Sequence, residues 1–378
     1  MPSSPSEILA ADLETGTGVW PFQRIRAVAE AGRIVAETPF DDDQIQPASL
    51  DLRLGAVGYR VRASFLPGRR WTMAARLADA DAERFELGDG AILKRGGIYI
   101  FPLQERVDLR KREAASANPK SSTGRLDVFA RLITDHGIQF DTVEEGYTGP
   151  LWLEVAPRSF DILVRPGSRL AQLRFRSGAP SLGSRAVREL NETHAIIRAE
   201  TGEPVMRDGA IALSVDVAGD ANGLVGFKSR PTDTPIDVDL REAYDPDDFW
   251  ERLYRPRRGG LILERDHFHI LASKETVAIP EGWAADMVAY DTLVGEFRVH
   301  YAGFFDPGFG WIGGERRGAK IVLEVRTHEV PFMVDDGQVA GFVAIERLSS
   351  ATDLPYGTRA GSNYQGQGLA LAKQFRRK

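Results

Sequence analysis

A short segment, residues 118–125, combines side-chain types that bind phosphate and reads Asn-Pro-Lys-Ser-Ser-Thr-Gly-Arg. Lys120 and Arg125 can meet phosphate charge, while the hydroxyls of Ser121 and Ser122 and nearby backbone N–H groups can surround phosphate oxygens. The same residue types are common in ordinary surface turns. The segment therefore indicates a polyphosphate site only if other parts of the chain supply matching chemistry.

Two glutamates, Glu154 and Glu324, each stand in the middle of a short apolar run with the composition of a strand. A strand glutamate commonly faces solvent, so neither residue alone indicates catalysis. Gly308, Gly310 and Gly313 spell a Gly-x-Gly-x-x-Gly pattern, but no helical pattern follows it. We therefore expect a hairpin or loop there, and not a dinucleotide site.

Composition narrows the class of protein. The chain has 378 residues, enough for two or three domains, and its 27% charged residues and net charge of -6 fit a soluble protein that is no general nucleic-acid binder. The absence of cysteine excludes disulfides, thiolate catalysis and the cysteine-bound zinc of zinc-dependent deaminases. The six histidines lack the spacing of a helical metal site. With no apolar run of membrane-span length and no signal peptide pattern, we expect the cytoplasm as compartment.

Short strands separated by Gly, Pro and Asp dominate the pattern of the first half, with one short helix expected at 21–31. The expected strands begin at Ser49 and then lie at 97–103, 151–155, 160–164 and 169–175. Helical periodicity is scarce elsewhere, apart from a short helix plus linker within 181–203. The sequence thus predicts an all-β fold of sandwich or barrel type.

The second half echoes the first, in the same order. The echoes pair 49–52 with 214–217, 95–98 with 258–261, and 151–155 with 321–325. They indicate an internal duplication with a period of about 165–170 residues. A short helix, capped by Asp245 with Pro246 at its first position, is expected as an insertion in the second half.

Together these motifs resemble the dCTP deaminase family, relatives of the trimeric deoxyuridine triphosphatases, in a double-length tandem form. The resemblance rests on 46–55 (Gln-Pro-Ala-Ser-Leu-Asp-Leu-Arg-Leu-Gly), 120–125, the hairpin 305–309 (Phe-Asp-Pro-Gly-Phe), Glu324 and the tail 363–367 (Asn-Tyr-Gln-Gly-Gln). It implies two tandem dUTPase-like domains, each a distorted jelly roll or β-barrel with few helices. The expected boundaries are 1–185 for the first domain, 186–204 for a linker, 205–350 for the second domain and 351–378 for a tail or lid.

The two copies keep different motifs. The first keeps the phosphate segment, with Lys120 where the family usually has Arg, but its hairpin reads Val-Glu-Glu-Gly-Tyr at 143–147. The second keeps 299–308 and Glu324, whereas 289–292 (Ala-Tyr-Asp-Thr) replaces the phosphate segment and 311–318 looks like an inserted loop. In the family one domain supplies the phosphate segment and its neighbour the hairpin, Glu and tail. The resemblance therefore implies one composite site between unlike halves.

The resemblance also implies roles for individual residues. Glu324 is the first candidate for the general base that activates water for attack on cytosine C4, with Glu154 as the second candidate. Substrate-binding residues are expected to be Lys120, Ser121, Ser122 and Arg125 for the triphosphate, Asp306 for sugar or base, Val322 through its main chain, and Tyr356 and Gln367 in the lid. Ser49 and Asp51 are expected to be structural. Mg²⁺ is expected to arrive with the triphosphate, with no metal site in the protein and no zinc.

Three functions stay open at this point. The first is deamination of dCTP to dUTP with release of ammonia. The second is a dUTP diphosphatase, or an enzyme that performs both steps. The third, from another class, is a non-catalytic nucleotide-binding regulator. The expected partners are a deoxynucleotide and further copies of the chain in a homo-oligomer, without nucleic acid or membrane.

Overall fold

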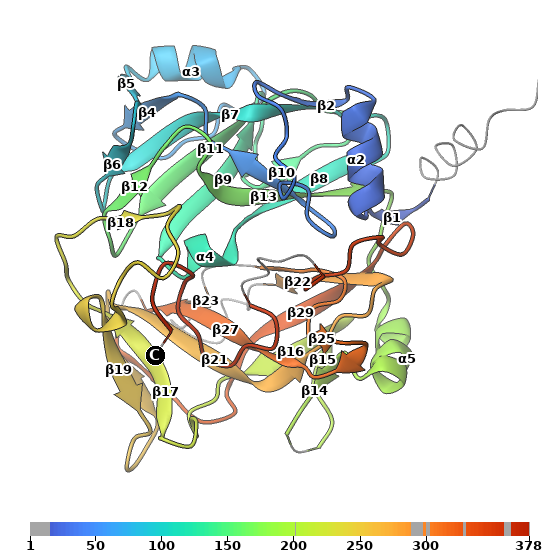
Figure 1. The fold of residues 1–378 in the computed structure, drawn as a ribbon, viewed down its shortest axis with the longest axis vertical. Coiled ribbons are helices and arrows are strands. Elements are labelled where there is room, and N and C mark those ends of the chain that lie inside the picture. The colour runs from blue at the N-terminus through green and yellow to red at the C-terminus, as the bar shows by residue number, and fades with distance from the viewer. Residues whose placement is uncertain are drawn as a thin grey trace, which may run out of the picture.

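The protein consists of two β-rich units stacked on each other, the N-terminal unit above the C-terminal unit in Figure 1. The computed structural model describes residues 16–200, 202–288, 298–299, 303–327, 330–358 and 364–377. In these ranges the helical elements are short: α2 (Phe22–Glu30), α3 (Met73–Asp79), α4 (Ser121–Gly124), α5 (Ser184–His194) and the 3-10 turn η1 (Pro246–Asp248). The predicted all-β class is confirmed. The segments 289–292 and 300–302 and residue Asn363, which the sequence singled out, lie outside the described residues.

The strands of the first half form two main sheets and one small one. These strands are β1 (Gly18–Val19), β2 (Ile34–Ala36), β3 (Leu50–Arg53), β4 (Val57–Val61), β5 (Glu83–Glu86), β6 (Ala91–Leu93), β7 (Ile98–Asp108), β8 (Glu113–Pro119), β9 (Val128–Thr134), β10 (Thr142–Val143), β11 (Thr148–Pro157), β12 (Ile162–Val164) and β13 (Arg169–Ser177). One main sheet runs β1-β13-β8-β10 with β3 beside β13, and the other runs β5-β4-β7-β11-β9 with β2 beside β7.

The second half repeats the order of the main sheets and adds strands of its own. Its strands are β14 (Ile197–Arg198), β15 (Met206–Arg207), β16 (Ala210–Ser214), β17 (Leu224–Ser229), β18 (Ile236–Asp237), β19 (Trp250–Tyr254), β20 (Leu261–Leu263), β21 (Phe268–Val277), β22 (Trp283–Val288), β23 (Arg298–Val299), β24 (Phe304–Phe305), β25 (Trp311–Ile312), β26 (Glu315–Arg316), β27 (Ala319–Arg326), β28 (Phe332–Val334) and β29 (Val339–Arg347). The order β16-β29-β22-β24 matches β3-β13-β8-β10, and β19-β17-β21-β27-β23 matches β5-β4-β7-β11-β9. The pair β20-β28 matches β6-β12. One hydrophobic core lies within the second half, and the core of the first half continues into residues of β17, β19, β21 and the C-terminal segment. The topology therefore supports the predicted duplication.

Two of the three sequence echoes are out of register in the structure. Glu154 pairs with Ile100 on β7 as Glu324 pairs with Ile270 on β21, so this echo is correct. The echo pairs Ser49 with Ser214, but in the structure the residue of the first half that is equivalent to Ser214 is Arg53. The backbone N–H groups of Arg53 and Ser214 each donate to a buried glutamate of the neighbouring strand.

This first misalignment amounts to four residues, and it has a simple cause. Side chains alternate with a period of two along a strand, so an even shift preserves the polar and apolar pattern. The echo at 258–261 is also displaced. Leu93 is the last residue of β6 to pair with β12, and Leu263 is the last residue of β20 to pair with β28. The two leucines are therefore equivalent, so residues 258–261 correspond to residues 88–91.

The strand pairs β4-β5 and β17-β19 are equivalent in the two halves. The connections within these two pairs fold differently. In the first half the connection contains α3, which the sequence analysis missed. In the second half it contains the expected cap of Asp245 on η1, and β18, which pairs in parallel with β12 of the first half. Phe249 next to η1 packs against Phe160 and Phe375, with ring centroids 5.9 and 5.4 Å apart. One aromatic cluster thus joins the first half, the insertion and the C-terminal segment.

A buried ion pair, Arg326 of β27 with Asp127 of the first half, crosses between the two units. Breaking a buried pair leaves an uncompensated charge and typically costs about 3–5 kcal/mol. We expect Arg326→Met to lower the free energy of unfolding by that order, measured by denaturant titration. Arg185→Met is the matched control, because the Arg185–Glu189 pair lies exposed on α5, and its loss should stay within about 0.5 kcal/mol. Equal effects of the two variants would show that the buried pair does not hold the halves together.

Candidate active site

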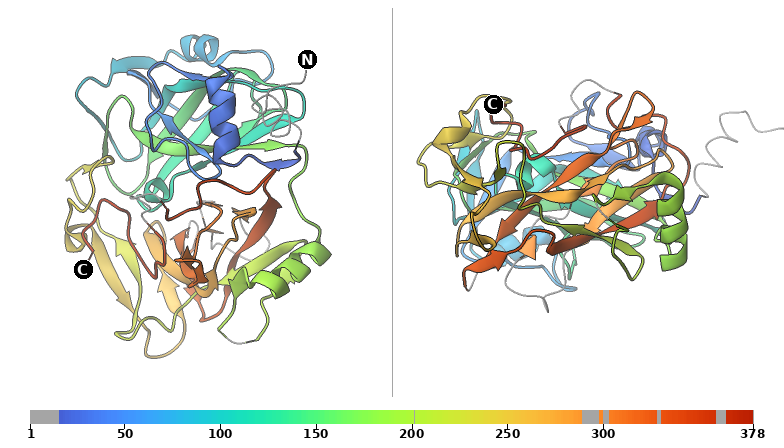
Figure 2. Two further views of the ribbon diagram at one scale, coloured as in Figure 1. Left: turned by 45° about the vertical axis from the view of Figure 1, so that its right-hand side comes forward. Right: turned by 90° about the horizontal axis from the view of Figure 1, so that it is seen from below.

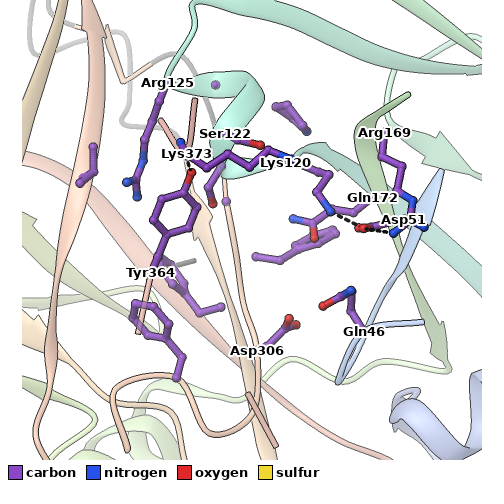
Figure 3. Close-up of a pocket in the computed structure, with 18 of the residues that line it drawn as sticks. Gln46, Asp51, Lys120, Ser122, Arg125, Arg169, Gln172, Asp306, Tyr364 and Lys373 are labelled. Carbon is purple, nitrogen blue, oxygen red and sulfur yellow. Dashed lines mark hydrogen bonds and ion pairs between the residues drawn. The ribbon is translucent and has the colours of Figure 1, made fainter. Parts of the chain in front are cut away.

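A cavity of ≈ 380 Å³ lies between the halves and is lined by residues from both of them and from the C-terminal segment. Figure 3 shows the side chains of the first half, including Lys120, Ser122 and Arg125, on one side and Asp306 of the second half opposite. The predicted residues Lys120, Ser121, Ser122, Arg125, Asp306, Val322, Glu324, Tyr356 and Gln367 all line this cavity. The structure therefore brings together the residues of the predicted composite site.

The phosphate segment forms a single helical turn, α4, between β8 and β9. The carbonyl of Lys120 accepts hydrogen bonds from the N–H groups of Thr123 at 2.7 Å and Gly124 at 3.0 Å, and that of Ser121 accepts from Arg125 at 3.1 Å. Lys120 N–H in turn donates to Leu170 of β13. This turn directs Lys120 and both serines into one cavity, as a phosphate-binding segment requires.

Cations near α4 are held by carboxylates of the first half. Lys120 Nζ forms an ion pair with Asp51, which is almost fully buried. Arg169 Nη1 lies 2.9 Å from Asp43 and 3.6 Å from Asp51. We predicted a structural role for Asp51, and it has one. It also lines the cavity and fixes the position of Lys120, which the sequence did not indicate.

Glu324 is buried on β27, and its Oε1 lies 3.8 Å from Nε of Arg125. Burial raises the pKa of Glu324 to about 8, although the positive charge of Arg125 opposes the shift. The carboxyl group therefore holds a proton at neutral pH and can release it near neutrality. A group of this kind can both accept and donate a proton in a reaction.

Asp306 is placed by the hairpin that follows β24. Its Oδ1 accepts from Nη2 of Arg174 at 3.1 Å, and burial raises the pKa of Asp306 against the effect of this guanidinium. Gly308, at φ +89°, lies so close to the C-terminal segment that a Cβ would stand 2.8 Å from the backbone N of Tyr356. Only glycine fits here, which explains the Asp-Pro-Gly sequence of the hairpin.

The C-terminal segment covers the cavity from the side of Arg125. The ring centroid of Tyr364 lies 3.9 Å from Cζ of Arg125, and Nη1 of the same arginine donates to the carbonyl of Ala370 at 3.2 Å. Gln367 accepts from Lys320 N–H at 3.0 Å, which joins the segment to β27. Burial raises the pKa of the Tyr356 phenol. Arg125, predicted as a phosphate ligand, thus also holds the covering segment.

Glu154, the second catalytic candidate, lies away from the cavity. Its Oε1 accepts from Nε of Arg131 at 3.0 Å in a buried ion pair. Trp152 occupies the place that Val322 takes in the second half, and it packs with Met73 of α3. The equivalent position in the first half is therefore filled by protein, and within one chain the structure does not support a catalytic role for Glu154.

Sequence reasoning missed several side chains that line the cavity. They come from β13, from the insertion of the second half and from the C-terminal segment: Arg169, Gln172, Asp239, Arg241 and Lys373. No local motif marks them, because folding brings them to α4 from distant parts of the chain. Within the described ranges no group of three or more His, Asp or Glu residues could hold a metal ion. None of the described helices is long and apolar enough to cross a membrane.

Two dUTPase-like β units that share a cavity lined by cations of α4 and a buried carboxyl group are typical of a nucleotide-acting protein of that superfamily. Comparison with known proteins gives the family. Residues 16–179 match the family model of the 2′-deoxycytidine 5′-triphosphate deaminase N-terminal domain, and residues 183–375 match that of the C-terminal domain. The chain belongs to the 2′-deoxycytidine 5′-triphosphate deaminase family.

Individual relatives agree with this assignment. A dCTP deaminase of Halorubrum lacusprofundi is 31% identical over 150 residues, which is 39% of this chain and 71% of the relative. A "dCTP deaminase, dUMP-forming" of Beutenbergia cavernae is 30% identical over 157 residues, 40% of this chain and 75% of the relative. The crystal structure of 2′-deoxycytidine 5′-triphosphate deaminase from Agrobacterium tumefaciens is 47% identical, covers 89% of this chain and 100% of its own, and superposes with a TM-score of 0.84.

The raised pKa of Glu324 predicts a pH-dependent stability. Between the ordinary value of 4.5 and about 8 the folded protein retains a proton that the unfolded chain loses, so folding stability falls as pH rises through this window. Glu324→Gln removes this contribution. We expect the melting temperature of the variant to exceed that of wild type by a margin that grows from pH 5 to pH 8. A margin independent of pH would contradict the raised pKa.

Proposed function

We propose that the protein deaminates dCTP to dUTP and releases ammonia, with Glu324 as the general base. The observation that carries the proposal is that a buried glutamate with a pKa near 8 shares one cavity with a phosphate-binding turn of the other half. Membership of the 2′-deoxycytidine 5′-triphosphate deaminase family and the names of the relatives support it. The cytoplasm and a homo-oligomeric state stay predictions.

In the proposed reaction the Glu324 carboxylate takes a proton from water while the water oxygen attacks C4 of cytosine. Glu324 then gives this proton to the amino group, which leaves as ammonia when the C4–N bond breaks. The second proton of the water passes from the added oxygen to N3, and C4 becomes the carbonyl carbon of uracil. A proton acceptor with a pKa near the working pH is best suited to both steps. Arg125, 3.8 Å from the carboxyl group, favours the charged form that begins the reaction.

The remaining side chains bind and orient the nucleotide. Lys120, Ser121 and Ser122 would contact phosphate oxygens, and Asp306 would accept a hydrogen bond from the sugar. Backbone groups at Val322, on the same strand as Glu324, would read the pyrimidine edge. Tyr356 and Gln367 would cover the bound base. Mg²⁺ would enter with the triphosphate and neutralise part of its charge, bound to phosphate oxygens.

A second candidate function is deamination with further hydrolysis to dUMP. The similarity to relatives named as dUMP-forming, such as the dCTP deaminase of Beutenbergia cavernae, favours testing it. Ammonia, pyrophosphate and phosphate should be quantified after incubation with dCTP and with dUTP. Ammonia alone from dCTP supports the main proposal, and ammonia with pyrophosphate supports the second. Pyrophosphate from dUTP without ammonia from dCTP indicates a diphosphatase, and no product indicates a binding protein.

Glu324→Gln should abolish ammonia release while dCTP binding persists, because the amide keeps the shape but cannot act as base. The loss in kcat should be at least about 10²-fold, the lower range for general acid–base catalysis. Glu154→Gln, at the equivalent place of the first half, is the control and should retain turnover if it folds. A dead Glu154→Gln that melts like wild type, beside an active Glu324→Gln, would assign catalysis to like halves of different chains.

The pH dependence of kcat/KM reports the ionisation of the free enzyme. Because the base must be unprotonated, we expect kcat/KM for dCTP to rise with pH and to level off above about 8, the pKa of Glu324. Steady-state rates of ammonia release between pH 5.5 and 9.5 test this. A profile that is flat from pH 6 to 9 would show that this ionisation does not govern the reaction.

A further inference from the structure

The guanidinium of Arg125 lies between the carboxyl group of Glu324 and the ring of Tyr364. Its Nε lies 3.8 Å from Oε1 of Glu324 and has no hydrogen-bond acceptor among the described residues. A charged N–H···O hydrogen bond is about 2.7–2.9 Å long, so the guanidinium stands roughly 1 Å short of direct contact with the proposed base. An attraction between opposite charges in a buried place should close this gap, unless other contacts hold the arginine back.

The C-terminal segment supplies contacts that hold the arginine. Cζ of Arg125 lies 3.9 Å from the ring centroid of Tyr364, a distance at which the face of the ring attracts a cation. Nη1 donates to the carbonyls of Ala370 at 3.2 Å and Leu371 at 3.5 Å. Figure 3 shows the ring of Tyr364 beside Arg125. These contacts oppose the attraction of Glu324.

Tyr364 itself has a fixed place in the second half and its own segment. Its N–H donates to the phenol oxygen of Tyr356 at 3.3 Å, and its phenol oxygen accepts from Lys373 N–H at 3.3 Å. The side chain of the next residue, Gln365, donates to the carbonyl of Gly308 in the hairpin at 3.1 Å. The ring can therefore hold a side chain that comes from the first half.

The equivalent pair of the first half shows the alternative arrangement. Arg131 also lies over a ring, with its Cζ 4.0 Å from the centroid of Phe140, yet its Nε donates to Glu154 at 3.0 Å. It donates further to Ser64 Oγ at 3.0 Å, and no backbone carbonyl among the described residues accepts from it. A ring alone therefore does not prevent the ion pair, and carbonyl bonds as long as those of Arg125 are weak. In the site the ring and the carbonyls act together.

The surroundings of Glu324 leave Arg125 as the cation that influences it. Its pairing partner on β21 is the apolar Ile270, and the charge that opposes burial in setting the pKa of Glu324 is that of Arg125. Burial raises the pKa of the Tyr364 phenol, so the ring stays uncharged around neutral pH. The other charged or titratable groups on the elements around this pair are Arg326, Arg241 and Tyr356.

We propose that Tyr364 is a positioning residue for the catalytic base, because its ring, with the carbonyls of Ala370 and Leu371, keeps Arg125 from pairing directly with Glu324. The inference deepens the proposed function and rests on it for the identity of the base. A direct ion pair stabilises a carboxylate, and a stabilised carboxylate is a weaker base. Since the ring belongs to the covering segment, the base has its working strength only while this segment covers the cavity.

The test is the pH dependence of kcat/KM for dCTP in Tyr364→Leu, with ammonia as readout. Leucine removes the ring face, so Arg125 can pair with Glu324, and the rise of the profile should move by about 1 pH unit or more to lower pH, as an adjacent opposite charge does to a carboxyl group. The plateau should fall below that of wild type. Tyr364→Phe keeps the ring face and should restore the wild-type profile. Tyr254→Leu is the matched control, because Tyr254 is exposed on β19 outside the cavity.

Two outcomes overturn the inference. A loss of kcat/KM by the same factor at every pH, with no shift of the profile, would show that Tyr364 only covers the cavity. An equal shift in Tyr364→Phe and Tyr364→Leu would show that the phenol hydroxyl acts, and not the ring. If Tyr364→Leu does not fold, Tyr364→Met, which also lacks an aromatic face, takes its place.

A measurement without substrate separates this inference from the proposed function. In the wild-type background the margin in melting temperature of Glu324→Gln over its parent should grow up to about pH 8. In the Tyr364→Leu background it should stop growing about 1 pH unit lower. If wild type releases no ammonia but this window shortens, the deaminase proposal fails and the positioning role stands. If ammonia is released and the window is the same in both backgrounds, the positioning role is wrong.

Discussion

The guanidinium of Arg174 joins the two halves and thereby defines the cavity. Arg174 extends from β13 of the first half and is almost fully buried. It donates to the carbonyl of Ala285 at 2.9 Å, to Asp286 at 2.5 Å and to Asp306 at 3.1 Å, and its Cζ lies 4.1 Å from the ring centroid of Phe304. A buried charge is costly unless its partners are in place. The second half supplies these partners from β22 and β24, so docking of the halves and placement of Asp306 are one event.

Glu154 on β11 and Glu324 on β27 occupy equivalent positions, but one forms a close ion pair and the other stays protonated. Both glutamates lie at the same register of equivalent strands. In the first half Arg131 of the adjacent strand contacts the carboxylate directly, which gives a structural ion pair. In the second half Arg125, which forms the ion pair with Glu324 among the described residues, belongs to the other unit, and its Nε lies 3.8 Å from the carboxyl group. Burial therefore dominates, and the carboxyl group keeps its proton. The partner of the glutamate, and not the glutamate itself, distinguishes the two copies.

Local sequence patterns predicted the fold class and helix α2, because alternation and helix stop signals are local properties. The composite site was implied by the resemblance to the dCTP deaminase family, and the residues named for it line one cavity. Local patterns could not fix the register of the duplication at 49–52, since an even shift preserves a strand pattern. They also missed Arg241 and Lys373, whose common feature is a shared location. Hydrogen bonds between the insertion and the C-terminal segment create that location, and no spacing in the sequence encodes it. Asp51 was expected to be structural, but its ion pair with Lys120 makes it part of the cavity lining.

The connection from β4 to β5 and its equivalent from β17 to β19 differ between the two copies. This difference determines which copy has an open cavity beside the strand that carries the buried glutamate. In the first half the residues between β4 and β5 fold back over their own sheet, and Met73 and Leu77 of α3 bury Trp152 where Val322 lines the cavity in the second half. In the second half the residues between β17 and β19 reach away from their sheet, pair with β12 of the first half and lie against the C-terminal segment (Figure 2). The connection between β4 and β5 therefore fills the space beside Trp152, whereas the connection between β17 and β19 contributes Asp239 and Arg241 to the cavity lining. The order of the main strands matches in the two copies. The differing connection therefore adds to the two sequence differences between the copies, the altered hairpin of the first half and the missing phosphate segment of the second half, in making the composite site asymmetric.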